Sequence, residues 1–203
     1  MTRLARDFYA RDTLTVAREL LGQRLVRYRR GQQLVGRIVE VEAYVGQGDQ
    51  ACHASRGRTA RNAVMFGPPG YAYVYFIYGM HHCFNVVTEP DGTAAAVLIR
   101  ALEPLEGIEA MRANRKGRQG AELTNGPAKL CYALDIDRAL NGADLVLGQR
   151  IWLEDDRAVD DARVSSGPRI GVRGDERALT VPWRLWIRDH SYVSRVRSAG
   201  TRG

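Results

Sequence analysis

The chain has 203 residues, 45% of them hydrophobic and 26% charged, with a formal net charge of +7. This length fits one domain, and such a chain buries about 70% of its unfolded surface, so it needs no metal or disulfide to fold. No stretch reaches the roughly 20 apolar residues of a membrane span, and the N-terminal segment lacks the apolar centre of a secretion signal. We expect a cytoplasmic single domain over residues 1–203, with a core from about 8 to 193 and a flexible C-terminal tail.

The basic residues are almost all arginine. Of the 30 lysines and arginines, only Lys116 and Lys129 are lysine. Arginine suits bidentate contacts with phosphate, and an excess of positive charge favours a polyanionic partner such as nucleic acid. The alternative interpretation is a compositional bias of the genome that leaves a solvated basic surface.

The predicted elements alternate between strands and a few short helices. Asp12 or Thr13 begins a helix that stops at Gly22. Two strands at 23–28 and 34–44 follow, and then a long polar loop at 45–62. Next come two aromatic strands within 71–89 that meet at 78–80, a strand at 94–104 and a helix at 105–115. A polar connector at 115–122, a helix opened by Pro127, and strands at 169–172 and 183–188 complete the chain. Short connections between strands predict an α+β fold: one mixed domain with a largely antiparallel sheet, flanking helices and a protruding β-hairpin.

Three cysteines at irregular spacing, Cys52, Cys83 and Cys131, predict reduced structural thiols rather than a disulfide framework. A zinc site is an alternative, because Cys52 adjoins His53 and Cys83 follows a pair of histidines. Neighbouring residues on a strand point to opposite faces, however, and no CxxC or HxxxH spacing is present. We therefore expect no metal.

The segment "IVEVEAY" at 38–44 places two carboxylates and a tyrosine on one face of a strand. Its apolar residues alternate with Glu40, Glu42 and Tyr44, which therefore point away from the core. A solvent-facing strand is the simplest interpretation. The carboxylate row ends at an aromatic residue, however, and leads into the loop that carries His53, so a pocket beside the sheet edge is the alternative.

The aromatic strands predict an unusual hairpin. Tyr71, Tyr73 and Tyr75 share one face, while Tyr78 and Met80 stand at the turn. An exposed aromatic residue beside a methionine could act as a wedge between base pairs of a nucleic acid. A protein interface or packing beneath the neighbouring loop would explain the same pattern.

Long segments of the chain resemble one known family. They are "RIVEVEAYVGQGDQACHASRGRTARNAVMF", "GYAYVYFIYGMHHCFNVVTE", "VLIRALEPLEGIEAMR", "LTNGPAKLCYAL" and "GPRIGV". In this order they resemble the alkyladenine (3-methyladenine or 3-methylpurine) DNA glycosylases, from about Phe8 to Val193. The resemblance implies a monomeric enzyme without metal or cofactor that flips alkylated or deaminated purines out of double-stranded DNA and hydrolyses the N-glycosidic bond, leaving an abasic site. It would act at the nucleoid if the source is a prokaryote.

The resemblance also implies catalytic roles. Glu42 corresponds to the general base that activates water. Arg100 corresponds to a basic residue near the water and the phosphate of the flipped nucleotide. Glu40 corresponds to a second acid, to which we assign no catalytic role.

The remaining family positions concern the base and the duplex. The resemblance implies that Tyr44 and Tyr75 sandwich the flipped base, that His53 beside the Ala51 main chain contacts its edge, and that Asn85 obstructs the amino group of normal guanine. Tyr78, next to Met80, corresponds to the residue that intercalates into the duplex. The chain departs from the family at His81, where an aromatic residue is common, and in a short segment at 114–122.

Two other functions are compatible with the sequence. A binding module could grip nucleic acid through the hairpin without chemistry, although binding alone does not need Glu42. A nucleoside or sugar hydrolase could use Glu40 and Glu42, but side chains two apart on a strand lie only about 7 Å apart on the same wall. The sequence does not indicate which lesion is preferred, nor a general acid for neutral leaving bases.

Overall fold

A single long strand, β2 (Gln32–Val45), organises the sheet. In the computed structural model, which describes residues 1–194, β2 pairs along its length with β5 (Ala95–Glu106). Its other edge pairs first with β1 (Arg24–Arg29) and then with β8 (Arg184–Ile187). The strand order is β3 (Ala72–Ile77), β4 (His81–Val87), β5, β2, β1 and β6 (Ile151–Glu154), and β7 (Val164–Gly167) pairs with β8. Every pairing among these strands is antiparallel, as expected.

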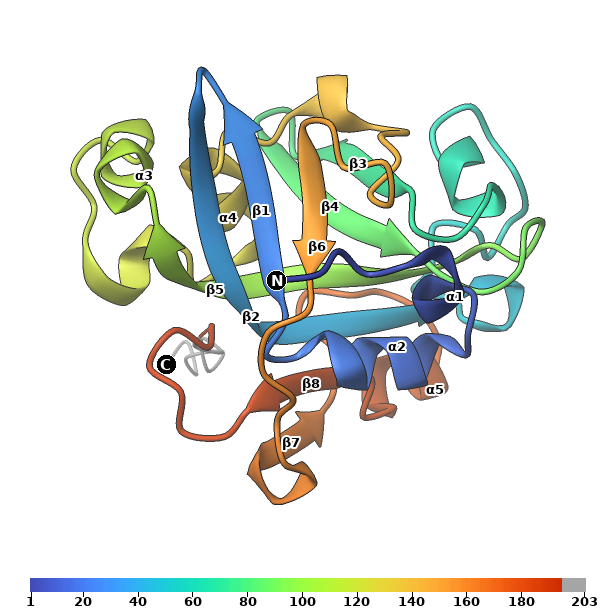
Figure 1. Cartoon of the computed structure of the whole chain (residues 1–203). Helices are drawn as coiled ribbons and strands as arrows, with labels where there is room; N and C mark the ends of the chain where they lie inside the picture. The colour runs from blue at the N-terminus through green and yellow to red at the C-terminus, as the bar shows by residue number, and fades with distance from the viewer. Residues whose placement is uncertain (195–203) are drawn as a thin grey trace.

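Short helices flank this sheet (Figure 1). They are α1 (Arg6–Tyr9), α2 (Thr13–Leu20), α3 (Ile108–Asn114), α4 (Pro127–Ala133) and α5 (Glu176–Thr180). One-turn 3₁₀ segments lie at Gly46–Gly48, Ala63–Phe66, Gly120–Leu123, Arg138–Leu140 and Asp161–Arg163. Asp12 caps α2 by accepting a hydrogen bond from the Thr15 amide, as its position predicts. None of the described helices is long and apolar enough to cross a membrane.

The two faces of the sheet serve different purposes. On one face, alternate residues such as Val41, Val74 and Ile99 join α2 and α4 in the main hydrophobic core. On the other face, Tyr73 and Ala96 pack with residues of the loop after β2, including Cys52, in a smaller cluster. The period-2 alternation of the strands therefore sends a second set of side chains toward that loop.

The structure confirms the α+β class, the single domain and the hairpin, whose strands meet at Tyr78, Gly79 and Met80. One predicted strand is wrong. Residues 169–172 form an irregular loop, because Arg169 donates to the Ala43 carbonyl and the Ile170 amide to the buried Glu42 carboxylate, rather than to a neighbouring strand. The three cysteines are free and buried, as predicted. The tail from 195 to 203 lies outside the described residues.

Candidate active site

A cavity of about 210 Å³ opens on the face of the sheet that the polar loop covers. It is smaller than the roughly 300–1,000 Å³ of pockets for drug-sized ligands, and so fits a group of about the size of one nucleic-acid base. The five residues that the resemblance assigns to the base pocket all line it. These five are Tyr44, Ala51, His53, Tyr75 and Asn85.

The first wall is Tyr44, whose ring is held in place from behind. The Arg169 guanidinium carbon lies 4.8 Å from the centre of this ring. Arg169 is itself buried and binds both carboxylate oxygens of Asp49, at 2.5 and 2.7 Å. It also donates a hydrogen bond to the Ala43 carbonyl. The loop at 169–172 and the loop after β2 are thereby joined at the back of the cavity.

A second wall consists of aromatic residues from β3 and the polar loop. The rings of His53 and Tyr75 meet edge to face, with centres 4.5 Å apart. Nδ1 of His53 lies 2.9 Å from the Tyr73 hydroxyl. Desolvation, with the nearby charge of Arg61, lowers the pKa of His53 to about 4. His53 is therefore a neutral hydrogen-bonding group at neutral pH, and not a proton donor of imidazolium type.

Asn85 completes the floor of the cavity from β4. Its side-chain amide donates to the Tyr73 carbonyl at 3.0 Å, across the strand pair that joins these two residues. The side chain is buried, so the hydrogen bond fixes its orientation toward the cavity.

Glu42 lies behind the Tyr44 wall and is fully buried. The carboxylate contacts three groups: it accepts hydrogen bonds from the Tyr44 hydroxyl at 2.8 Å and the Ile170 amide at 2.7 Å, and pairs with Arg100 at 3.1 Å. All three stabilise its negative charge. Burial and this negative charge raise the pKa of Tyr44 well above its usual value, so the phenol keeps the proton that it donates.

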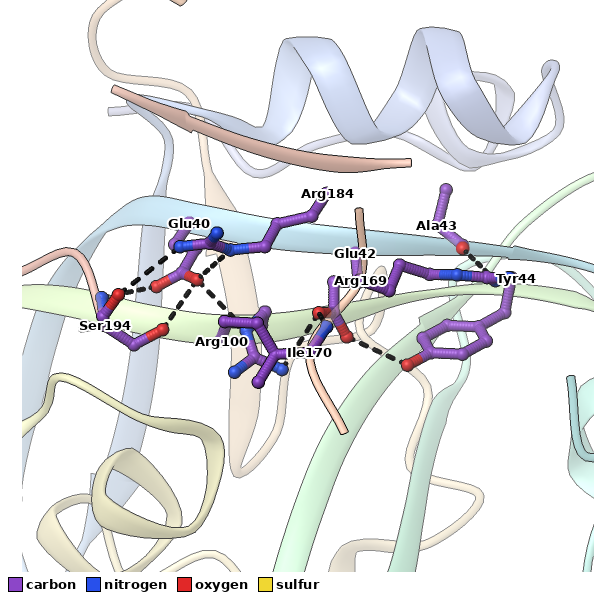
Figure 2. A network of polar contacts seen from close by, with 9 residues as sticks. All are labelled: Glu40, Glu42, Ala43, Tyr44, Arg100, Arg169, Ile170, Arg184 and Ser194. Atoms are coloured by element: carbon purple, nitrogen blue, oxygen red, sulfur yellow. Dashed lines mark hydrogen bonds and ion pairs between the residues drawn. The ribbon is translucent and has the colours of Figure 1, made fainter. Parts of the chain in front are cut away.

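Arg100 reaches Glu42 because β5 has a bulge at this point. Glu40 pairs with Ala101 and Val41 with Ile99, which leaves Arg100 as the extra residue. Figure 2 shows its guanidinium between the two glutamates, with Nε bound to Glu40 and Nη1 to Glu42, both at 3.1 Å. Burial disfavours the charged guanidinium, but Glu42 and then Glu40 outweigh this effect and raise the pKa of Arg100.

Glu40 is also fully buried, so the interpretation of "EVE" as a solvent-facing strand is wrong. Besides Arg100, it accepts hydrogen bonds from Arg184 at 2.6 Å and from both the amide and the hydroxyl of Ser194 at 2.7 Å (Figure 2). Its oxygens are thus occupied by protein groups, which gives no support to a hydrolase with Glu40 and Glu42 as a catalytic pair.

The hairpin tip lies outside the cavity. Tyr78 is 78% exposed and Met80 is 59% exposed. Ile77, one residue before Tyr78, lines the cavity. The tip is therefore exposed, as the sequence predicted, and its neighbour Ile77 places it next to the cavity.

Exposed arginines lie at the cavity and in the loop after β2 that covers it. Arg56, Arg58, Arg61 and Arg173 are exposed, and Arg173 lines the cavity itself. The guanidinium groups of Arg58 and Arg61 lie over the rings of Phe66 and Tyr75. These charges leave the mouth electropositive and suited to phosphate groups.

The histidines and cysteines are not arranged for metal binding. Across residues 1–194, no three histidine, cysteine, aspartate or glutamate side chains come together as a metal site. Burial raises the pKa of Cys52 and Cys83, which disfavours the thiolate form that binds zinc. These groups do not fit the zinc alternative.

Sequence reasoning missed three contributors to the site: Asp49, Arg169 and the Ile170 amide. Arg169 and Ile170 belong to the segment "GPRIGV", whose apolar residues are typical of a strand. The one local sign of this role was an arginine, Arg169, between two glycines. Its partner Asp49 lies 120 positions away, and no sequence pattern connects the two residues.

Comparisons with known proteins identify the family of the chain. A family model described as "Methylpurine-DNA glycosylase (MPG)" matches residues 7–191. A protein of Methanocella arvoryzae is 53% identical over 196 residues, covering 96% of this chain and 97% of its own. One of Myxococcus xanthus is 50% identical over 202 residues, covering 100% and 98%, and one of Alkaliphilus oremlandii is 48% identical over 202 residues, covering 95% and 99%. All three bear the description "Putative 3-methyladenine DNA glycosylase".

Proposed function

Since the chain belongs to the methylpurine-DNA glycosylase family and is a DNA-3-methyladenine glycosylase of base excision repair, we propose that it hydrolyses the N-glycosidic bond with Glu42 as general base. The observation that carries this proposal is the buried Glu42 carboxylate, held between Arg100 and the Tyr44 wall of a base-sized cavity. The enzyme acts as a monomer and leaves an abasic site without cutting the strand.

The reaction begins when the damaged nucleotide rotates out of the duplex, at a cost of a few kcal/mol that is smallest for damaged bases. The base enters between Tyr44 and Tyr75, with His53 at its edge. Water attacks the anomeric carbon as the bond to the base breaks. Glu42 accepts the water proton and its negative charge stabilises the oxocarbenium-like sugar, while Arg100 holds the carboxylate in place.

The cavity favours bases that are already cationic. Tyrosine faces attract such bases by about 0.5–2 kcal/mol, and a cationic purine departs as a neutral base without receiving a proton. Hypoxanthine and other neutral lesions need a proton on departure, and neutral His53 does not supply one. Deaminated purines are thus slower substrates than alkylated, cationic ones.

The duplex lies across the cavity mouth. Arg56, Arg58 and Arg61 contact its phosphates, which position the DNA without reading its sequence. Tyr78 and Met80 enter the gap left by the flipped nucleotide and replace part of the lost stacking.

An excision assay tests this function. Duplex oligonucleotides with hypoxanthine or ethenoadenine, and methylated genomic DNA, are incubated with the enzyme, and released bases are quantified by chromatography. Release of 3-methyladenine, with strand breaks only after alkali, is the expected result. Binding of damaged DNA without release of any base would instead indicate a binding module.

A further inference from the structure

The tip of the hairpin has little to hold it within its own loop. Tyr78 adopts φ +54°, an uncommon conformation for a residue with a side chain, and Gly79 follows at φ +67°. The Met80 amide donates a backbone hydrogen bond to the Ile77 carbonyl at 3.2 Å, just beyond the last strand pair, Ile77 with His81. Tyr78 and Met80 are both largely exposed, so packing within the tip does not fix them.

Helix α4 supports the tip from outside the loop. The hydroxyl of Tyr132 donates a hydrogen bond to the Met80 carbonyl at 2.5 Å. Its ring meets His81 edge to face, with centres 5.8 Å apart. An aromatic ring thus stands against position 81, supplied by α4 rather than by the strand itself.

Tyr132 is a firm support because its helix is anchored. Its neighbours Leu130, Cys131 and Ala133 are buried in the main core, and α4 packs on β4 and β5. Pro127 begins this helix at its first turn. The tyrosine is 42% exposed, so its hydroxyl binds the tip without being part of the core.

We infer that Tyr132 is a positioning residue that preorganises the wedge for insertion into the duplex. Inserting a mobile tip costs the free energy of ordering it, whereas a tip already held at Met80 avoids part of this cost. The inference rests on the proposed role of Tyr78 as the wedge. It adds a residue that contacts neither the base nor the catalytic carboxylate.

A double-mutant cycle tests this inference. Tyr132→Phe removes the hydroxyl but keeps the ring against His81, so the fold stays intact, which thermal unfolding verifies. We expect Tyr132→Phe to weaken binding to a hypoxanthine duplex by about 2- to 10-fold, the range of one hydrogen bond. Its affinity for the single-stranded form of the same hypoxanthine oligonucleotide should be unchanged, because single-stranded DNA has no base-pair stack into which the wedge could insert. Tyr28→Phe, which removes a hydroxyl from another exposed tyrosine, is the matched control.

The cycle also separates this inference from the wedge proposal. Tyr78→Ala should weaken duplex binding, and adding Tyr132→Phe to it should cause no further loss, because the support acts through the wedge. A normal duplex affinity for Tyr132→Phe beside a weakened Tyr78→Ala would overturn the inference and leave the wedge standing. Additive losses would overturn it too. An unaffected Tyr78→Ala would refute the wedge, and the inference with it.

Discussion

At the scale of single residues, Glu40 and Glu42 differ in what surrounds them. Glu40 accepts hydrogen bonds from Arg100, Arg184 and Ser194, whereas Glu42 faces the Tyr44 wall of the cavity. Glu40 therefore holds Arg100 in place and joins the C-terminal segment to the site.

Glu40→Gln removes the buried negative charge that Arg100 and Arg184 share. We expect it to lower the free energy of unfolding by roughly 3–5 kcal/mol, as measured by urea denaturation. The control is Glu19→Gln, which breaks a surface pair with Arg11 and should cost about 0–1 kcal/mol. Equal effects of the two substitutions would contradict the structural role of Glu40.

His53 gives stability a dependence on pH. Its pKa is lowered from 6.5 to about 4 in the folded protein by desolvation and by Arg61. Between these values the unfolded chain binds a proton that the folded chain does not, so the free energy of unfolding falls as the pH drops from about 6.5 to 4. His53→Gln should lose less stability than the wild type between pH 7 and pH 5 in urea titrations. An equal loss of unfolding free energy in both proteins would show that His53 does not cause the pH dependence.

The tyrosines that line the cavity could be predicted from the sequence, whereas the partners of the buried carboxylates could not. Alternation on β2 and β3 places Tyr44, Tyr73 and Tyr75 on one face, which local patterns reveal. Burial of Glu40 could not be predicted, because Arg184 and Ser194 lie 144 and 154 positions away. Only the folded chain brings such distant charges together.

At the scale of elements, the loop at 169–172 is as important to the site as any strand. Arg169 binds Asp49 and stacks on Tyr44, and the next amide binds Glu42. The strand predicted here was wrong because four residues with two apolar side chains look alike in a strand and in a buried loop. The 71–89 hairpin was predictable because an aromatic run and a second segment with a buried Phe84 flank a glycine turn.

Arg169→Lys tests the support that this loop gives. Lysine keeps the charge but loses the two-point contact with Asp49 and the stacking on Tyr44. We expect the free energy of unfolding to fall by roughly 1–3 kcal/mol and the KM for damaged DNA to rise. Arg11→Lys, at the surface pair with Glu19, should change neither quantity measurably. A wild-type KM in Arg169→Lys would show that the loop does not shape the base pocket.

At the scale of the whole molecule, the position of the arginines matters more for DNA binding than the net charge of +7. Arg58 and Arg61 lie in the loop after β2, whereas α3 lies at the opposite end of the molecule in Figure 1. The sequence predicted a polyanionic partner, but only the fold shows that these arginines stand beside a base-sized cavity.

Salt dependence of DNA binding tests this distribution. Each phosphate that the protein neutralises contributes about −0.9 to the slope of log affinity against log salt. The double variant Arg58→Gln/Arg61→Gln should reduce the magnitude of the slope by up to about 2 in fluorescence anisotropy titrations. Arg112→Gln, on α3, should leave it unchanged. Equal slopes for all three proteins would place the DNA elsewhere on the surface.

Single-turnover excision by Glu42→Gln shows whether Glu42 performs the chemistry. Wild type and variant are compared on a hypoxanthine duplex, with binding measured separately and folding checked by thermal unfolding. We expect the variant to excise hypoxanthine at a rate at least about 100-fold lower, the usual contribution of a general base, with affinity for the lesion retained. Excision at the wild-type rate by a folded Glu42→Gln enzyme would contradict this role of Glu42.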